Sequence, residues 1–188
     1  DKKAAIKAKA DAKRAAAKAM TMHLIEQGHK RIALIKGPQS SPLTRERLVG
    51  YRDALTESGL TFDESLLYPG DFTLQSGHDA ATKIIASEHR PSAVFCENDE
   101  TAIGAMQCFK QAGLRIPQDI SIAGFDDISF SAFCDPPLTT IAQPAEEFGQ
   151  SAVSLLIDLL EGKITKAPKV IMPFELIVRA STGPAPTS

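Results

Sequence analysis

Polar side chains follow directly after two apolar runs of the chain, and their chemistry suits ligand binding. The first run ends on Glu97, Asn98 and Asp99, and the second ends on Asp126 and Asp127. Carboxylates accept hydrogen bonds, and the amide of asparagine both donates and accepts them. Two strands that end in this way are expected to present polar groups to the same small molecule, provided that the fold brings their ends together.

Apolar runs alternate with helix-type patterns along the chain, which predicts an α/β fold. Near-continuous apolar runs are typical of strands in a parallel sheet that helices cover on both faces. Strands are expected at 31–35, 92–96, 119–125, 138–143 and 169–179, with a short extended piece at 65–72. Helices are expected at 20–27, 44–58, 74–87, 99–112 and 145–162, with Thr44 as the N-cap of the second.

The carboxyl ends of parallel strands lie at one edge of their sheet, and ligands of open α/β sheets bind outside that edge. The residues expected to line this edge are Ser40, Ser41, Arg47, Phe72, Asn98, Asp99, Asp126 and Asp127. Carboxylates accept hydrogen bonds from hydroxyls, arginine and asparagine donate them, and an aromatic ring covers the apolar face of a ligand. This set of groups predicts a site for a polyol or a sugar.

Several of these side chains also have a structural interpretation that the sequence leaves open. Asp99 has the position of an N-cap for the helix that follows it, and Asp127 has that of a cap for the turn that begins there. Arg47 fits a solvated residue in the first turn of its helix, and Phe72 fits a core residue. The binding interpretation therefore depends on the edge that the side chains share, since no single residue is specific.

Length and composition indicate a globular chain. Its 188 residues suffice for one domain or one large lobe, and its hydrophobic share of 43% is typical of a folded protein. No apolar run approaches the roughly 18 residues of a membrane span, and the first ten residues are too polar for a signal peptide. Cys96, Cys108 and Cys134 lack the spacing of a metal site. We expect a cytoplasmic protein in a reducing compartment, without a metal and without a membrane partner.

Charge is distributed unevenly along the chain. Residues 1–18 carry seven basic and two acidic side chains, or +5, so the rest carries −7 to give the net charge of −2. A body this acidic is a poor candidate for nucleic-acid binding. The sequence predicts an atypical Ala- and Lys-rich helix at 1–19. It is interpreted either as a basic arm for DNA or a membrane or, in preference, as a solvated helix with little to bury.

An enzyme is the less favoured interpretation. Asp99, Asp126 or Asp127 would then have to hold Mg²⁺, as strand-end carboxylates do in phosphoryl-transfer proteins. The sequence contains no P-loop, GxGxxG, GxSxG or HExxH motif. The histidines are not beside these carboxylates, which leaves acid–base pairing unsupported; they are His23, His29, His78 and His89. We therefore expect neither catalytic residues nor a cofactor.

Seven motifs occur in a fixed order between residues 20 and 182. They are GHKRIALIKGP, RERLVGYRDAL, GDF, AVFCENDETAIGA, GxxxPxDISIAGFDD, PPLTTIAQP and LIVRAST. In this order they resemble the lactose/galactose repressor (LacI/GalR) family of bacterial transcription regulators. The stretch 133–144, together with 70–73 and 94–96, is most similar to the cytidine-responsive members of that family.

The resemblance implies an effector domain of two lobes that close on a small molecule, each a parallel sheet flanked by helices of the type I periplasmic-binding-protein kind. The residues implied to contact the ligand are Arg47, Asn98, Asp126 and Gln143 through hydrogen bonds and Phe72 through its ring. From the shared edge, Ser41, Asp99 and Asp127 are expected to stand behind them. In cytidine-type members the ligand is a nucleoside such as cytidine, with a sugar as the less favoured effector.

The resemblance also divides the chain into segments. The C-terminal lobe corresponds to 20–137 and 163–182, a strand crossing between lobes to 138–143, a helix of the N-terminal lobe to 144–162, and a tail to 183–188. The helix–turn–helix and most of the first lobe of the family have no counterpart here. The resemblance implies the sensor part of a homodimeric repressor that contacts operator DNA only through such an absent domain. A periplasmic sugar-binding protein of a transport system, which shares the fold, is the alternative.

Overall fold

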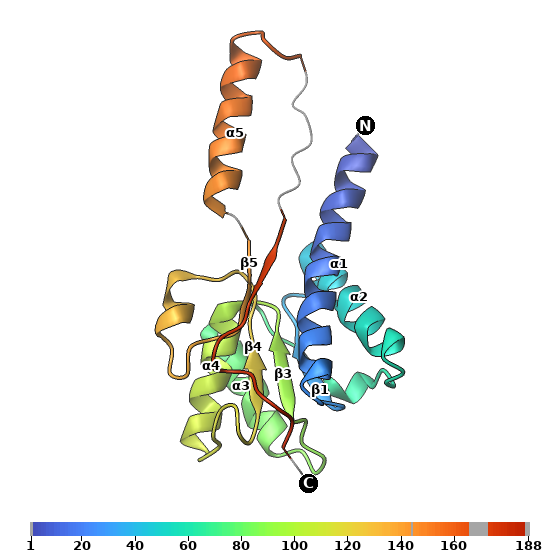
Figure 1. Cartoon of the computed structure of the whole chain (residues 1–188), viewed down its shortest axis with the longest axis vertical. Coiled ribbons are helices and arrows are strands. Elements are labelled where there is room, and N and C mark those ends of the chain that lie inside the picture. The colour runs from blue at the N-terminus through green and yellow to red at the C-terminus, as the bar shows by residue number, and fades with distance from the viewer. Residues whose placement is uncertain (1, 144, 166–172, 187–188) are drawn as a thin grey trace.

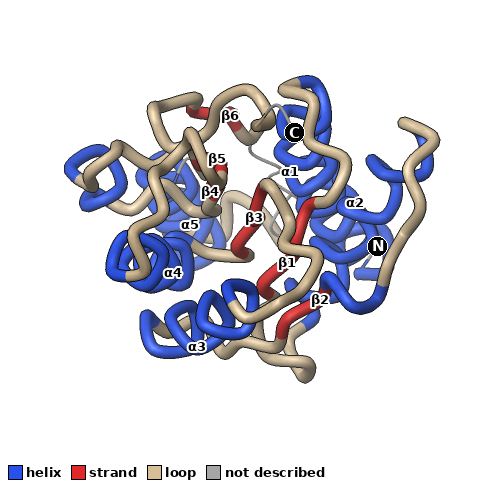
Figure 2. Tube along the Cα trace, turned by 90° about the horizontal axis from the view of Figure 1, so that it is seen from below, coloured by secondary structure: helices blue, strands red, loops and turns tan. Residues whose placement is uncertain are grey.

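A four-stranded parallel sheet forms the centre of the computed structural model, which describes residues 2–143, 145–165 and 173–186. The strands lie in the order β2-β1-β3-β4. They span Leu67–Tyr68 (β2), Ile32–Ile35 (β1), Ala93–Cys96 (β3) and Ser121–Ala123 (β4). Helices α1 and α2 cover one face of the sheet, and α3 and α4 cover the other (Figure 1, Figure 2). The predicted α/β class with a parallel sheet covered on both faces is confirmed.

Each central strand contributes side chains to both halves of the core. Ala33, Ile35 and Val94 pack in the half that contains α3 and α4, whereas Ile32 and Leu34 pack in the half that contains α1 and α2. Every residue of β1 and β3 is buried. Because successive side chains point to opposite faces, a strand covered on both faces has to be apolar at every position. This arrangement explains why the sequence shows apolar runs rather than alternation.

Three of the α-helices begin at a side-chain cap. They are α2 (Pro42–Glu57), α3 (Leu74–Ile85) and α4 (Asp99–Gln111), capped by Ser41, Thr73 and Asn98 respectively. The prediction that Thr44 caps α2 is wrong. Proline is favoured at the first helical position because it lacks an N–H, and the hydroxyl of Ser41 accepts a hydrogen bond from the Leu43 amide at 3.2 Å.

Helix α1 runs without a break over Lys2–Glu26. The expectation of a solvated helix with little to bury is wrong for its second half, because Ala16, Ala17 and Met20 are buried in the core beside the sheet. Helix α2 approaches closely there, and a Cβ added to Gly50 would lie 2.2 Å from the backbone oxygen of Arg14. Small side chains allow this approach, and a search for large apolar anchors does not detect it.

A two-stranded antiparallel ribbon leaves the sheet beside β4 and leads to helix α5. Strand β5 (Thr140–Ala142) pairs with β6 (Glu175–Ile177), and an isolated bridge joins Asp126 to Ala142. Helix α5 (Ala145–Leu160) projects away from the sheet on the same side as the start of α1 (Figure 1). The ribbon therefore rises from the carboxyl edge of the sheet.

Strands β4, β5 and β6 are several residues shorter than the sequence predicts. The predicted ranges 119–125, 138–143 and 169–179 correspond to pairing over 121–123, 140–142 and 175–177, and residues 169–172 lie outside the described part of the chain. Apolar runs report burial rather than strand pairing. Phe125 and Leu138 illustrate the difference, since both are buried outside the paired segments.

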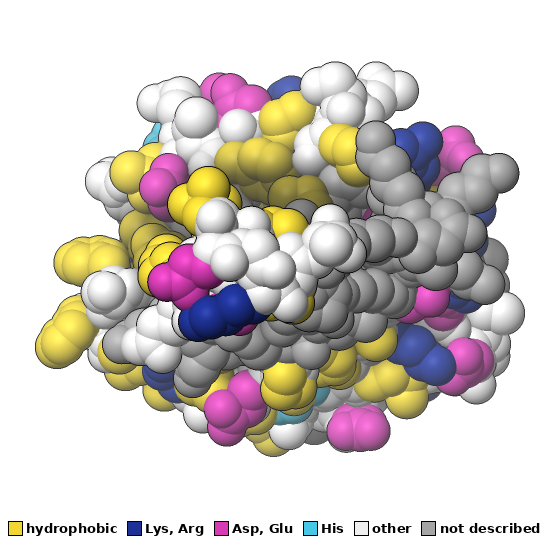
Figure 3. Space-filling view, turned by 90° about the horizontal axis from the view of Figure 1, so that it is seen from above, with side chains coloured by type: hydrophobic (Ala, Val, Ile, Leu, Met, Phe, Trp, Pro, Cys, Tyr) yellow, Lys and Arg dark blue, Asp and Glu magenta, His cyan; other side chains and the backbone are white. Residues whose placement is uncertain are grey.

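Apolar side chains reach the surface on α5 and on the short 3₁₀ helix η2 (Ser129–Phe133). The larger ones are Phe130, Phe133, Val153, Leu156, Ile157 and Leu160. Figure 3, seen from above the top of Figure 1, shows apolar side chains between polar and charged ones on this face. Among the residues that the structure describes, no helix has both the length and the apolar character that a bilayer span requires.

The C-terminal segment packs against the amino edge of the sheet. The amide of Ala185 donates to the Gln27 carbonyl at 2.8 Å, and the Gly183 carbonyl lies 3.0 Å from Nε2 of His29. Residues 183–186 of the predicted tail therefore pack against this edge, while residues 187 and 188 lie outside the described part of the chain.

Candidate ligand-binding site

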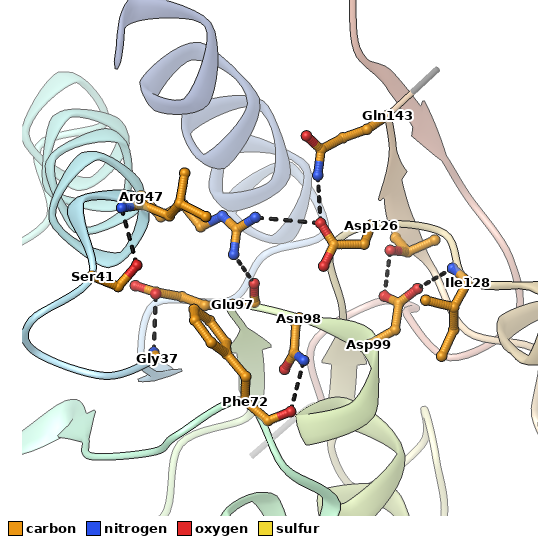
Figure 4. Close-up of polar contacts among 12 residues, drawn as sticks. Gly37, Ser41, Arg47, Phe72, Glu97, Asn98, Asp99, Asp126, Ile128 and Gln143 are labelled. Carbon is orange, nitrogen blue, oxygen red and sulfur yellow. Dashed lines mark hydrogen bonds and ion pairs between the residues drawn. The ribbon is translucent and has the colours of Figure 1, made fainter. Parts of the chain in front are cut away.

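The strand register brings the polar strand ends together. Ile35 of β1 is level with Cys96 of β3, and Phe95 is level with Ala123 of β4. The residues that follow these positions therefore leave the sheet at one edge. Figure 4 shows Arg47, Phe72, Glu97, Asn98, Asp126 and Gln143 around that edge. The predicted convergence of the strand ends is thus what the structure shows.

Arg47 is the central cation of the site. Its side chain is 3% exposed, so the interpretation as a solvated residue is wrong. Nη2 donates to Oδ1 of Asp126 at 3.3 Å, Nη1 donates to the carbonyl of Glu97, and the guanidinium carbon lies 3.8 Å from the centre of the Phe125 ring. Burial lowers the pKa of Arg47, and the nearby carboxylates, Asp126 foremost, oppose that effect.

Asp126 presents its carboxylate partly to solvent. The side chain is 37% exposed, and Oδ1 accepts hydrogen bonds from Arg47 and from Nε2 of Gln143. Burial raises the pKa of Asp126, and Arg47 counteracts the rise. Its φ of 111° lies in a region that side chains rarely adopt, and its amide donates to the Ile141 carbonyl at 2.8 Å. The backbone of β5 therefore helps to hold this carboxylate at the edge.

Phe72 lies across the loop that follows β1. A Cβ added to Gly37 would lie 2.1 Å from Cζ of Phe72, so the ring lies directly on that glycine. The carbonyl of Phe72 accepts a hydrogen bond from Nδ2 of Asn98 at 2.9 Å, which holds its left-handed backbone with φ of 72°. The ring centre lies 6.0 Å from the guanidinium carbon of Arg47. Phe72 is half-buried and belongs to neither core cluster, so the core interpretation does not describe it.

Asn98 and Asp99 have defined structural contacts. Asn98 caps α4, since its Oδ1 accepts a hydrogen bond from the Thr101 amide at 3.1 Å. The alternative that Asp99 is this cap is therefore wrong. Asp99 is fully buried, and its carboxylate accepts hydrogen bonds from the Ile128 amide at 2.9 Å and from the hydroxyls of Ser131 and Thr140 at 2.7 and 2.6 Å. It ties the loop after β4 and strand β5 to helix α4.

The other predicted residues point to contacts away from Arg47. Asp127 pairs with Arg179 at 2.8 Å, and the residue at the N-cap of η2 is Ile128, without a side-chain hydrogen bond. The alternative that Asp127 caps this turn is therefore wrong. The hydroxyl of Ser41 caps α2, and Ser40 is exposed. The structure thus brings together Arg47, Phe72, Asp126 and Gln143, with Asn98 joined to them through Phe72.

Glu97 is a member of this cluster that the site prediction omitted. Its side chain is fully buried, and Oε2 accepts a hydrogen bond from the Gly37 amide at 3.0 Å. Burial raises the pKa of Glu97 to about 7, although the Gly37 amide and the charge of Arg47 act in the opposite direction. The signal was present in the sequence, because a buried strand continues directly into this acidic residue.

Several polar atoms at this edge are buried without a hydrogen-bond partner. Among the described residues they are Oγ1 of Thr44, Nε of Arg47, Oε1 of Glu97 and Oγ1 of Thr101. Buried polar groups are nearly always paired in folded proteins, so each exception needs an explanation. Their grouping around the carboxyl edge indicates a place where the fold is not optimised for stability alone.

Two hollows of the molecular surface do not coincide with the Arg47 cluster. They lie at the opposite, amino edge of the sheet, one near Ser92 and Asp119 and the other near Arg31 and Asp63. They lack the convergent buried charges of the Arg47 cluster. Within the described residues, no three His, Cys, Asp or Glu side chains are grouped as a metal ion would require.

Comparison with known proteins places the chain in a family. The model of the periplasmic binding protein-like domain matches residues 21–182. The HTH-type transcriptional repressor CytR of Escherichia coli (strain K12) is 45% identical over 164 residues, which are 87% of this chain and 48% of that protein. The chain thus spans about half the length of this curated relative.

Solved structures agree with this match. The Escherichia coli transcriptional repressor ascG is 33% identical with a TM-score of 0.84, over 92% of this chain and 62% of that one. A LacI family transcriptional regulator from Enterococcus faecium with bound ribose is 31% identical with a TM-score of 0.85, over 92% of this chain and 64% of that one. The chain therefore belongs to the periplasmic binding protein-like domain family, in the form found in LacI-family transcriptional regulators.

Proposed function

We propose that this chain is the effector-sensing part of a transcriptional repressor and that its ligand is a nucleoside such as cytidine. The observation that carries the proposal is the carboxylate of Asp126, which Arg47 and Gln143 hold at the sheet edge while leaving it partly exposed. Vicinal hydroxyls donate to a carboxylate in this position, and a neighbouring guanidinium donates back to them. The site therefore suits the ribose part of a nucleoside.

The choice of a nucleoside combines two arguments. Phe72 offers a half-buried ring 6.0 Å from the Arg47 guanidinium, where it can lie against a base or a sugar ring. The chain also resembles cytidine-responsive members of the family. The Enterococcus faecium relative has ribose bound, and ribose is the sugar that a nucleoside contains. A free sugar is the less favoured ligand, because it would cover less of the Phe72 ring than a nucleoside would.

The second wall of the site is proposed to come from another lobe. Residues 20–137 and 163–182 would then form the C-terminal lobe, 138–143 the strand between lobes, and 144–162 a helix of the N-terminal lobe. Helix α5 supports this division, because it projects from the sheet with Val153 and Leu156 exposed. Effector binding would shift the balance between lobe arrangements and, through a homodimer, the placement of DNA-reading domains outside this chain.

Homodimer formation has its own supporting observation. Phe130 and Phe133 expose 58% and 80% of their surfaces on η2, and exposed aromatic side chains are enriched where proteins associate. Sedimentation of the protein over a range of concentrations tests this part of the proposal. A monomer at every concentration would contradict it.

A regulator is proposed rather than a transport protein or an enzyme. The relatives that support this choice bear the names of transcriptional repressors. A cleaved signal peptide on the natural gene product would instead favour a periplasmic sugar-binding protein. Turnover in a Mg²⁺-dependent phosphatase screen that Asp126→Ala abolishes would favour an enzyme.

Calorimetric titration tests the choice of ligand. Cytidine, adenosine, ribose and galactose are titrated into this chain and into the longest natural form of the protein. We expect heat with cytidine, weaker binding of ribose, and the weakest with galactose. Binding of galactose alone would contradict the nucleoside, and the absence of heat with all four would contradict the ligand site itself.

A further inference from the structure

Glu97 lies beside Arg47 at the candidate site and is not among the residues proposed to contact the ligand. Its side chain is fully buried at the end of β3, and its Oε2 accepts a hydrogen bond from the Gly37 amide. Its Oε1 is buried without a partner. We infer that Glu97 is a positioning residue of the site and that ligand capture at Asp126 is coupled to the uptake of a proton by Glu97. This inference rests on the function proposed above.

One buried cation serves two carboxyl groups at this edge. Arg47 donates to the backbone oxygen of Glu97 and to the carboxylate of Asp126, and its charge acts on both side chains. The other charged groups that face the pair are Lys36 after β1, Asp99 on α4 and Lys13 on α1. Two carboxylates that share one cation in a buried place cannot both ionise at low cost, so the proton of one depends on the state of the other.

Hydrogen bonding decides which carboxyl group holds the proton. Asp126 is partly exposed and accepts from Arg47 and Gln143, both of which favour its ionised form. Glu97 has no exposed surface; the Gly37 amide donates to its Oε2, and the Thr44 hydroxyl beside it also favours the ionised form, but burial outweighs both. A buried polar group without partners is costly, and an ion more so. The proton is therefore expected on Glu97, in agreement with the direction in which burial shifts its pKa, to about 7.

Ligand binding strengthens this preference. Ligand hydroxyls that donate to Asp126 stabilise its negative charge and keep the Arg47 guanidinium paired with it. A ligand placed against Phe72 also excludes water from the loop that covers Glu97, since the Phe72 ring lies directly on Gly37. Both effects raise the free energy of ionised Glu97, so binding near neutral pH draws a proton from the buffer and converts the carboxylate into a carboxylic acid.

The sign of the pH dependence follows from this coupling. The pKa of Glu97 is higher in the complex than in the free protein, so affinity is greatest where Glu97 is already protonated. Affinity falls as pH rises through about 7, the pKa of the free protein, and the decline approaches about tenfold for each pH unit. A site without the coupling has a flat profile over the same range, because ribose does not ionise there.

Two measurements on the intact protein test the inference. Carboxyl ¹³C NMR of wild type follows the ionisation of Glu97 directly, and we expect a midpoint near 7. Calorimetry with ribose and with cytidine at pH 7.5, in two buffers of different ionisation enthalpy, counts the protons taken up. Because about a quarter of Glu97 is already protonated at pH 7.5 when its pKa is about 7, we expect uptake of up to about three-quarters of a proton for wild type. Glu97→Gln keeps the acceptor for Gly37, so we expect it to bind without proton uptake and with a flat pH profile.

Glu100→Gln is the matched control, because this carboxylate is exposed in the first turn of α4. We expect it to retain the proton uptake of wild type. A Glu97 midpoint at the ordinary glutamate value, or ligand binding without proton uptake, overturns the inference and leaves the proposed function standing. If neither probe binds, the proposed function fails and the coupling fails with it. The NMR midpoint is measured on wild type and therefore does not depend on the folding of a variant.

Discussion

The two edges of the sheet bury polar groups in opposite ways. At the amino edge, Nδ1 of His29 lies 2.8 Å from the hydroxyl of Ser92, and Nε2 lies 3.1 Å from Ser121 and 3.0 Å from the Gly183 carbonyl. Both ring nitrogens are therefore paired. At the carboxyl edge, Arg47 and Glu97 are equally buried, yet each retains an atom without a partner. The chain itself supplies hydrogen-bond partners for both ring nitrogens of His29, but it does not supply them for every polar atom of Arg47 and Glu97.

We interpret the difference as one between a side chain that is buried to stabilise the fold and side chains that are buried to bind a ligand. The Gly183 carbonyl only accepts hydrogen bonds, so Nε2 of His29 carries the hydrogen and Nδ1 accepts from Ser92. This network ties the C-terminal segment to the starts of β3 and β4. The Arg47 cluster also joins α2 to the ends of β3 and β4, but it retains unpaired atoms, which reduce stability. Such a cost is typical of residues that a fold keeps for binding.

His29→Ala should have the largest effect. It removes three hydrogen-bonded contacts of a fully buried side chain and leaves the hydroxyls of Ser92 and Ser121 short of a partner. We expect the free energy of unfolding to fall by roughly 3 kcal/mol, measured by urea denaturation. His89→Ala, at an exposed position, serves as the control and should change it by less than about 0.5 kcal/mol. Equal effects would show that the amino-edge network does not stabilise the fold.

The pH dependence of stability should differ in sign between the two edges. Burial raises the pKa of Glu97 from 4.5 to about 7, so stability is full below 4.5 and declines as pH rises toward 7, by about 3 kcal/mol in all. Burial lowers the pKa of His29 from 6.5, so its contribution is full above 6.5 and is lost as pH falls below that value. Urea denaturation of wild type and Glu97→Gln from pH 4 to 9 measures both effects. A constant difference between the two proteins would contradict the sign assigned to Glu97.

Asp126→Ala should weaken ligand binding by roughly 2 kcal/mol, since it removes the exposed acceptor of the site. Arg47→Ala is expected to act at least as strongly. Asp127→Ala is the matched control, because this neighbouring carboxylate pairs with Arg179 instead. Calorimetry with cytidine measures all three variants. Equal losses for Asp126→Ala and Asp127→Ala would remove the distinction between the two aspartates.

Asn98→Ala should have the smallest effect on stability. It removes the N-cap of α4 and the hydrogen bond to the Phe72 carbonyl, and we expect a loss of about 1 kcal/mol in the free energy of unfolding. Asn98→Asp retains the cap oxygen and should recover most of that loss. If Asn98→Asp is as unstable as Asn98→Ala, the bond to Phe72 outweighs the cap.

The fold was predictable from local patterns. The runs around Ile32–Ile35 and Ala93–Cys96 are apolar at every position, as a doubly covered strand requires, and alternate with helix signals. The convergence of Arg47 and Asp126 followed from the same reasoning, because the carboxyl ends of parallel strands share an edge. Two predictions from the local sequence were wrong, namely the N-cap at Thr44 and the solvated first helix, in which Ala16 and Ala17 are buried. These depend on proline geometry and on a close approach of two helices.

The sequence by itself determined the α/β class, the polar edge and the likeness to a family of regulators, because hydrophobic pattern and residue order are local properties of the chain. Tertiary structure alone decided that Arg47 is buried, that Asp99 ties β5 to α4, and that Glu97 is buried without a full set of partners. The physical reason is that the exposure and charge state of a polar group depend on neighbours distant in the sequence. Gly37, Thr44 and Phe72 meet around Glu97 only once the chain has folded.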